Sequence, residues 1–112
     1  MSQAPNTQRL FELHALICQT VANPKRLEII AHLRQGERTV GDLAECLAAS
    51  QSNVSQHLSV MRKNGIVRAR RTGSSVFYRI ANPKIIKACQ LMREVLLEHL
   101  ESEALVAEAA RG

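Results

Sequence analysis

Residues 50–65, SQSNVSQHLSVMRKNG, combine the marks of a helix with an unusual polar composition. The serine that opens the stretch is a typical N-cap residue, and a glycine is the residue that most often follows a helix C-terminus. Val54, Leu58 and Met61 recur at intervals of three and four residues, which predicts a narrow apolar stripe on one helical face. The other side chains are mainly Ser, Gln and Asn, without the mixture of Glu and Lys that a solvated face usually carries. The polar side of this helix therefore needs an explanation of its own.

That polar side has the chemistry of a surface that reads DNA. At 100° per residue, the side opposite the apolar stripe holds Ser52, Gln56, Ser59 and Lys63, flanked by Asn53 and Ser55. Gln and Asn can make paired hydrogen bonds to adenine, and Ser can bond to several base edges or to phosphate. Taken alone, such a helix is more simply a soluble surface, so the interpretation depends on the neighbouring segments.

Charge is segregated along the chain in a way that favours an anionic partner. The 112 residues carry a formal net charge of +5 and a sequence pI of about 9.6. Between Cys46 and Arg93 there are nine cations and no acid, whereas the other six cations and all ten acids lie outside that window. A basic block of this kind in a folded chain is the electrostatic footprint expected of a nucleic-acid-binding surface.

A membrane surface is the alternative anionic partner, and the sequence argues against it. It has no apolar run near the ~18 residues of a spanning helix, no basic helix with a large apolar face, and no signal peptide. We therefore expect a cytoplasmic protein without a membrane partner. The three cysteines are an odd number at wide spacings, which predicts free thiols rather than a disulfide framework or a zinc finger.

Cap and periodicity signals predict five helices. Asn-Pro pairs at residues 23–24 and 82–83 each supply an N-cap followed by proline at the first helical position, and Thr39 and Asp42 have capping-box spacing. The predicted helices cover, approximately, residues 7–22, 24–33, 40–47, 51–64 and 83–101. The third of them is expected to bury Val40, Leu43, Ala44 and Leu47.

Residues 66–80 have the pattern of a β-hairpin, because IVRARR and SVFYRI flank the turn sequence TGS. The cations Arg68, Arg70 and Arg71 would suit an edge strand that resists aggregation. They lie, however, beside a small tip at residues 73–75 whose backbone suits contact with phosphate or the minor groove. The charge segregation makes the DNA role the stronger interpretation.

Two short helices joined by a tight turn and followed by a basic hairpin predict a winged helix-turn-helix: mainly α, with about five helices and a two-stranded wing. The second helix of such a pair enters the major groove. A winged helix used only for protein contacts would leave the basic block unexplained. An enzyme would need a constellation that the chain lacks, since His14 and Cys18, one turn apart, are the nearest to a catalytic pair.

Residues 10–100 resemble the ArsR/SmtB family of winged-helix transcriptional regulators. The resemblance is carried by ANPKRLEIIAHL, TVGDLAECL and SQSNVSQHLSVMRKNGIVRARRTGSSVFYRI. It implies that residues 1–112 form a single winged helix-turn-helix domain and act as a homodimeric repressor on double-stranded operator DNA. It also implies that the first and last helices, about 7–22 and 83–101, form the dimer interface, and that a small inducer releases the DNA.

The expected DNA contacts fall into two groups. The recognition helix contributes Gln51, Ser52, Asn53, Ser55, Gln56, His57, Ser59 and Lys63. The wing contributes Arg68, Arg70, Arg71, Thr72, Ser74 and Ser75. No catalytic residue is expected, nor any cofactor for folding or DNA binding.

The inducer sites of the family are not reproduced in this chain. Thr39 and Gly41 stand where the family's metal box has thiolates, and the first position of its persulfide-sensing pair is Ala31. The family's zinc site on the last helix falls here on Asn82, Lys84, Val95 and Glu98, whereas zinc needs about four good ligands. We therefore expect no metal site. The inducer could be a metal or metalloid ion or a thiol-reactive species, with Cys89, Cys18 and Cys46 as candidate sensor thiols. The alternative is a family member without metal sensing that is regulated by redox or by expression level alone.

Overall fold

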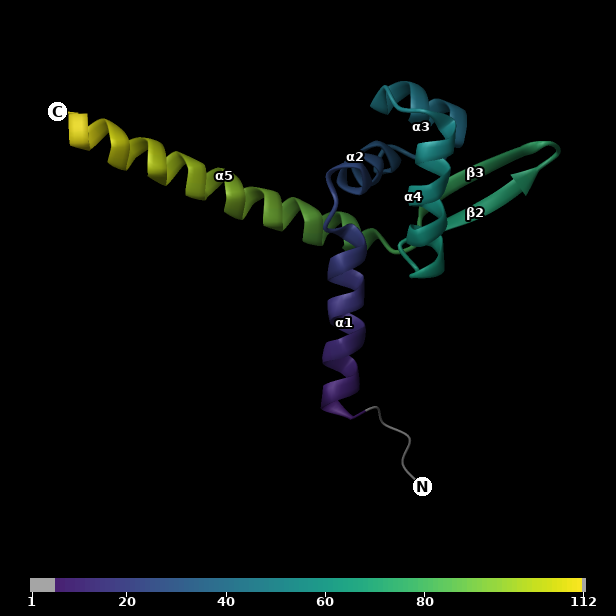
Figure 1. Cartoon of the computed structure of the whole chain (residues 1–112), viewed down its shortest axis with the longest axis horizontal. Coiled ribbons are helices and arrows are strands. Elements are labelled where there is room, and N and C mark those ends of the chain that lie inside the picture. The colour runs from purple at the N-terminus through teal and green to yellow at the C-terminus, as the bar shows by residue number, and fades with distance from the viewer. Residues whose placement is uncertain (1–5, 112) are drawn as a thin grey trace. The chain divides into compact units, whose positions relative to one another are not determined.

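The computed structural model describes residues 6–111, which divide into two compact units, one ending at Asn82 and one beginning at Pro83. The elements are α1 (Thr7–Val21), α2 (Pro24–Leu33), β1 (Arg38–Thr39), α3 (Val40–Leu47), α4 (Gln51–Lys63), β2 (Val67–Thr72), β3 (Ser75–Ile80) and α5 (Pro83–Arg111), in the order drawn in Figure 1. The first unit has the predicted winged helix-turn-helix architecture, and α5 forms the second unit by itself.

The caps predicted for α2, α3 and α4 form, and they decide where these helices begin. The Asn23 side chain accepts hydrogen bonds from the backbone N–H groups of Lys25 (2.9 Å) and Arg26 (3.2 Å) at the start of α2. Ser50 Oγ accepts one from the Asn53 N–H (3.0 Å) at the start of α4. Gly65, which follows the end of α4, has φ +78°, a left-handed conformation that favours glycine.

The core lies between α2, α3, α4 and the beginning of β2. Its fully or almost fully buried apolar side chains are Ile29, Ile30, Leu33, Leu43, Ala44, Leu47, Val54, Leu58, Met61, Ile66 and Val67. The apolar stripe predicted for residues 50–65 is thus confirmed, as is the burial of three of the four side chains predicted for α3. The fourth, Val40, is only half-buried because it is the first residue of its helix.

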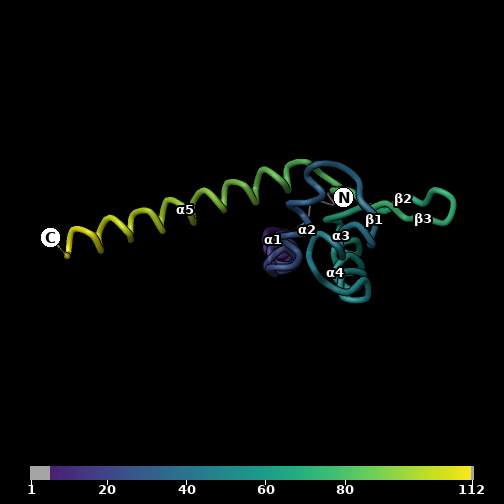
Figure 2. Tube along the Cα trace, turned by 90° about the horizontal axis from the view of Figure 1, so that it is seen from above, coloured from purple at the N-terminus to yellow at the C-terminus, as the bar shows by residue number. Residues whose placement is uncertain are grey.

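The sheet has three strands rather than the two that the sequence predicts. Strand order is β1-β3-β2 with antiparallel pairing throughout, and β1 adds Arg38 and Thr39 opposite Tyr78 and Phe77. Two residues are too few to show the alternation by which a strand is recognised in sequence, so β1 could not be predicted. Figure 2 shows the β2–β3 hairpin reaching beyond the helices of its unit as a wing.

The first and last helices of the chain, α1 and α5, differ from their predicted extents and carry exposed apolar side chains. α1 ends one residue early, at Val21, and α5 continues to Arg111 instead of ending near residue 101. The longer α5 reflects the helix-favouring Glu and Ala residues of its last eleven positions. No side chain of α5 is buried within the protomer. Its exposed large apolar residues are Leu91, Met92, Val95, Leu96, Leu97, Leu100, Leu105 and Val106.

Candidate nucleic-acid interface

Helix α4 presents the polar residues that the sequence singles out. Val54, Leu58 and Met61 are each 0% exposed, so the opposite side of α4 must face away from the core. The predicted recognition residues Gln51, Ser52, Asn53, Ser55, Gln56, Ser59 and Lys63 are all exposed. No acid lies within α4, so a phosphate backbone would meet no repelling charge on this helix.

His57 differs from the other predicted recognition residues because its side chain is partly buried against α2. Its Nδ1 accepts a hydrogen bond from Arg26 Nε (3.1 Å), which requires a neutral imidazole ring. Partial burial, together with the positive charges of Arg26 and Lys25, lowers the pKa of His57 below its usual value. The geometry therefore shows His57 fastening α4 to α2. A contact between His57 and phosphate stays a prediction.

Hydrogen bonds also fasten the end of α4 to α1. Asn64 Nδ2 donates to Thr20 Oγ1 (2.9 Å), and that hydroxyl donates to the Leu16 carbonyl (2.7 Å) within α1. Arg26 Nη1 donates to the Thr20 carbonyl (3.2 Å), so the same arginine contacts the end of α1 and the middle of α4. Thr20 is only 3% exposed, and its satisfied hydroxyl costs little to bury. The recognition helix is thus held at two points.

The lowered pKa of His57 predicts a pH dependence of folding. The His57 ring binds a proton more readily in the unfolded chain than in the folded chain. The stability that neutral His57 contributes is therefore fully present above about pH 6.5 and falls as the pH is lowered through that value. We expect the urea midpoint of the wild-type protein to fall between pH 7.5 and 5.5. The urea midpoint of His57→Gln, which keeps a hydrogen-bond acceptor for Arg26, should fall less over the same pH change. His14→Gln serves as the control for removal of an exposed histidine, and equal slopes in wild type and His57→Gln would contradict this assignment.

The register of the wing divides its cations between two faces. β2 pairs with β3 so that Arg68 lies opposite Arg79, Arg70 opposite Phe77 and Arg71 opposite Val76. Because side chains alternate along a strand, Arg68, Arg70 and Arg79 share one face, and Arg71 lies on the other. Arg68, Arg71, Thr72, Ser74 and Ser75 are all exposed. The tip turns through Gly73, whose φ of +60° is left-handed.

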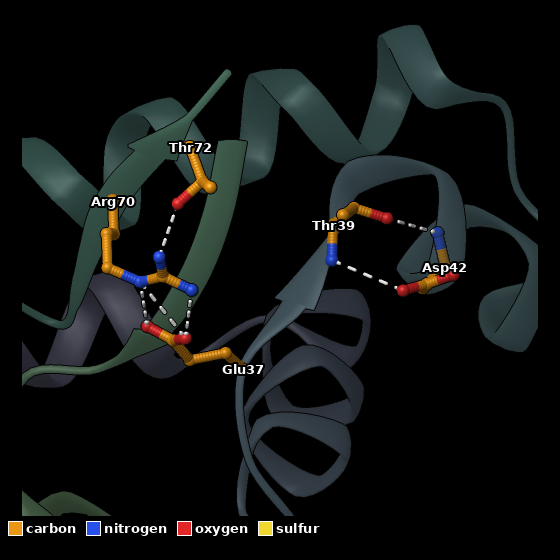
Figure 3. Close-up of polar contacts among 5 residues, drawn as sticks. All are labelled: Glu37, Thr39, Asp42, Arg70 and Thr72. Atoms are coloured by element: carbon orange, nitrogen blue, oxygen red, sulfur yellow. Dashed lines mark hydrogen bonds and ion pairs between the residues drawn. The ribbon is translucent and has the colours of Figure 1, made fainter. Parts of the chain in front are cut away.

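Arg70 differs from the other wing cations because all three nitrogens of its guanidinium make contacts within the protein (Figure 3). Its Nε lies 3.2 Å from both carboxylate oxygens of Glu37, its Nη2 lies 2.8 Å from Glu37 Oε1, and its Nη1 contacts Thr72 Oγ1. The guanidinium carbon is also 5.1 Å from the centre of the Phe77 ring, within cation–π range. The hydrogen bonds that Arg70 donates to Glu37 lower the pKa of Glu37 and raise the pKa of Arg70.

The start of α3 adjoins this pair, as Figure 3 also shows. The Asp42 N–H donates to Thr39 Oγ1 (3.1 Å), and the Thr39 N–H donates to Asp42 Oδ2 (3.5 Å). This is the capping box that the sequence predicts. Because Thr39 is also the second residue of β1, the sheet and the first helix of the helix-turn-helix pair meet at a single residue.

The three thiols lie in different surroundings. Cys18 and Cys46 are exposed, and Cys89 is half-buried. Burial raises the pKa of the Cys89 thiol, which lowers its thiolate fraction. Among residues 6–111, no three His, Cys, Asp or Glu side chains gather where they could hold a metal ion. Nor does any helix within that range have the length and hydropathy needed to cross a membrane.

Sequence reasoning missed the residues that hold the interface in place. These are Glu37 and Phe77 beneath Arg70, and Thr20, Arg26 and Asn64 behind α4. One signal was present, since the basic block lacks acids of its own and any carboxylate that pairs with its arginines must come from outside it. Three of the hydrogen bonds that hold the interface, Arg26–His57, Arg70–Glu37 and Asn64–Thr20, join residues 31 to 44 positions apart, and no local pattern records such pairings.

Comparison with known proteins identifies the family. The family model of the bacterial regulatory proteins of the arsR family matches residues 23–69. An uncharacterized HTH-type transcriptional regulator of Mycobacterium tuberculosis is 36% identical over 107 residues, which cover 95% of this chain and 94% of the relative. The biofilm growth-associated repressor of Agrobacterium fabrum is 38% identical over 78 residues, covering 70% and 67% of the two chains.

A solved structure agrees with the sequence relatives. The homodimeric winged helix-turn-helix DNA-binding domain of a possible ArsR-family transcriptional regulator from Mycobacterium bovis superimposes with a TM-score of 0.78 at 31% identity. The superposition covers 90% of this chain and 95% of that domain. The chain belongs to the ArsR family of bacterial regulatory proteins and is a transcriptional regulator, not an enzyme.

Proposed function

We propose that the protein is a cytoplasmic homodimeric repressor that binds double-stranded operator DNA, with α4 in the major groove and the wing on the adjacent backbone. The observation that carries the proposal is the exposed, acid-free polar face of α4, held by a buried apolar stripe beside a wing rich in arginine. Base edges in the major groove present the donors and acceptors that Gln, Asn and Ser side chains bind.

Within this proposal the two groups of residues have different tasks. Gln56 and Asn53 have the amide groups suited to paired hydrogen bonds with adenine, and Ser52, Ser55 and Ser59 can bond to base edges or phosphate. Gln51 and Lys63, near the two ends of α4, would contact the backbone. In the wing, Arg68 and Arg71 would neutralise phosphates, while Thr72, Ser74 and Ser75 would contact the backbone at the tip.

The proposed dimer rests on the apolar side chains that α1 and α5 expose. Within one protomer, Phe11 of α1 is 63% exposed, Met92 of α5 is 68% exposed and Leu96 is 53% exposed. Apolar surface on this scale typically marks a protein–protein contact. The homodimeric relative from Mycobacterium bovis supports the same assembly. We propose that α1 and α5 form the dimer interface and that residues 1–112 act as one DNA-binding domain, with a partner copy completing it.

The proposal is tested by measuring binding to two duplexes, one enriched from a random pool by the protein and one of random sequence. We expect steep weakening with salt on both duplexes and tighter binding of the enriched one by about 10³-fold or more. Equal affinity for the two would show a nonspecific binder, and no binding at low salt would leave the fold with a role in protein contacts. A reporter gene placed downstream of the enriched sequence distinguishes repression from activation, because a repressor lowers its expression.

The inducer proposal concerns the thiols. Cys18 and Cys46 are accessible, whereas the raised pKa and partial burial of Cys89 make that thiol slower to react. If a thiol-reactive species releases the DNA, we expect it to act first at Cys18 or Cys46. A variant with serine at positions 18, 46 and 89 should then hold its DNA in the presence of oxidants or arsenite that release the wild type. Release from both proteins would contradict thiol sensing, and release from neither would leave regulation by expression level.

A further inference from the structure

We propose that Arg70 is a positioning residue, which clamps the wing to β1 through Glu37 and leaves phosphate contact to the other wing cations. The inference rests on the proposed function, because it concerns how the wing is aimed at DNA. The Arg70 guanidinium binds the Glu37 carboxylate and lies over the Phe77 ring. Direct contact of Arg70 with DNA, expected from sequence, is the alternative that the experiment below separates from this role.

The Arg70 side chain links two strands of the sheet to the residue that precedes the third. Arg70 belongs to β2, it lies over the ring of Phe77 in the central strand β3, and it ends on Glu37, the residue before β1. The register explains this path, because Phe77 pairs with Arg70 on one side and with Thr39 on the other. Three N–H···O contacts of 2.8–3.2 Å join the guanidinium to the carboxylate in the fork geometry that arginine favours.

The clamp engages Nε and one N–H of each terminal nitrogen of Arg70, three of the five donors of its guanidinium. Nε and Nη2 of Arg70 face Glu37, and Nη1 faces Thr72. The side chains of Arg68, Arg71 and Arg79, by contrast, have no hydrogen-bond or ion-pair partner within residues 6–111, although the charge of Arg79 helps to lower the pKa of Glu37. Arg68 and Arg79 lie directly opposite each other on one face, an arrangement of like charges that a bound phosphate would stabilise. The cations available to DNA are therefore the neighbours of Arg70.

The clamp lies where it can set the direction of the wing. A two-stranded hairpin is marginally stable by itself. β1 pairs only with Tyr78 and Phe77 of β3, so the tip at residues 72–75 has no third strand beside it. Glu37 immediately precedes β1, which leads directly into the Thr39 cap of α3. Arg70 thus ties the outer half of the wing to the segment that begins the helix-turn-helix pair. Loss of this tie would let the tip move relative to α4.

Two variants decide between the roles. Glu37→Gln/Arg70→Gln removes the ion pair without changing the net charge. Arg71→Gln removes one positive charge from the other face of the wing. On a random-sequence duplex, Arg71→Gln should reduce the salt slope by about 0.9, whereas the double variant should leave it unchanged. On the enriched duplex, the double variant should bind about threefold to fivefold more weakly, because an exposed ion pair contributes only modestly. Single Glu37→Gln should weaken that binding to a similar extent, because the clamp fails when either partner is removed.

The opposite results would overturn the inference. Tighter binding by Glu37→Gln, or a loss of about 0.9 in the salt slope of the double variant, would show that Arg70 contacts phosphate and that Glu37 competes for it. Unchanged affinity of the double variant for the enriched duplex would show that the pair has no positioning role.

A measurement without DNA separates failure of the clamp from failure of the proposed function. Amide hydrogen exchange in β2 and β3 should speed up in Glu37→Gln/Arg70→Gln and stay at the wild-type rate in Arg71→Gln. If exchange behaves in this way but the wild type binds no DNA, the clamp stands and the proposed function fails. Unchanged exchange in the double variant would contradict the clamp, whatever the DNA measurements show.

Discussion

Leu96→Glu is expected to convert the dimer to a monomer and to weaken binding to the enriched duplex about a hundredfold or more. Leu96 is 53% exposed in the protomer, among the apolar residues of α5 that we propose meet a partner copy. A carboxylate buried in such an interface would lose its water without gaining a partner. Two recognition helices bound through one dimer gain about 10²–10⁴ in avidity over a single one, and this gain would be lost.

Analytical ultracentrifugation and binding to the enriched duplex measure the two halves of this prediction. Gln90→Glu is the matched control, because it adds the same charge to an exposed position on a different face of α5. Neither substitution changes a side chain of the core within residues 29–67, so both variants should still unfold cooperatively on heating. A Leu96→Glu protein that remains dimeric and binds like the control would place the dimer interface elsewhere.

Gln56→Ala is expected to cost about 1–3 kcal/mol in binding the enriched duplex and to leave binding to a random duplex nearly unchanged. Gln56 is exposed on the side of α4 opposite Val54, Leu58 and Met61, and its amide can both donate to and accept from one base. The loss should therefore appear as reduced discrimination between sequences, with the salt slope retained, because no charge has been removed.

The control for Gln56→Ala is Gln90→Ala, which shortens an exposed glutamine of α5, outside the proposed DNA surface. Equal losses by Gln56→Ala on enriched and random DNA would mean that Gln56 supports the fold or the backbone contacts. In that case the base readout assigned to α4 would be wrong.

Local chemistry made much of the fold predictable. Asn23, Thr39, Ser50 and Gly65 mark helix ends through bonds to residues two to four positions away, and such short-range signals survive in the sequence. The spacing of the apolar side chains on α4 likewise fixed which face is buried and which is exposed. The polar face that suggested DNA binding was predictable for the same reason.

The parts that could not be predicted depend on tertiary contacts. β1 is recognisable only through its pairing with β3, since Arg38 and Thr39 alone carry no periodicity. Arg70 has the composition of a phosphate ligand, and only the folded sheet shows Glu37 and Phe77 beside it. His57 likewise belongs to the polar helix in sequence but faces Arg26 in the structure. Arg70 and His57 are thus residues of a DNA-binding type that have a partner within the protein.

The most direct test of α4 as the reading element is methylation interference on the enriched duplex. If α4 of each subunit lies in the major groove, purine methylation at guanine N7 should block binding at two half-sites centred about 34–36 Å apart, one helical turn of DNA. Gln56→Ala should weaken interference at specific positions within both half-sites. Interference confined to the minor groove, or spread evenly along the duplex, would contradict the account.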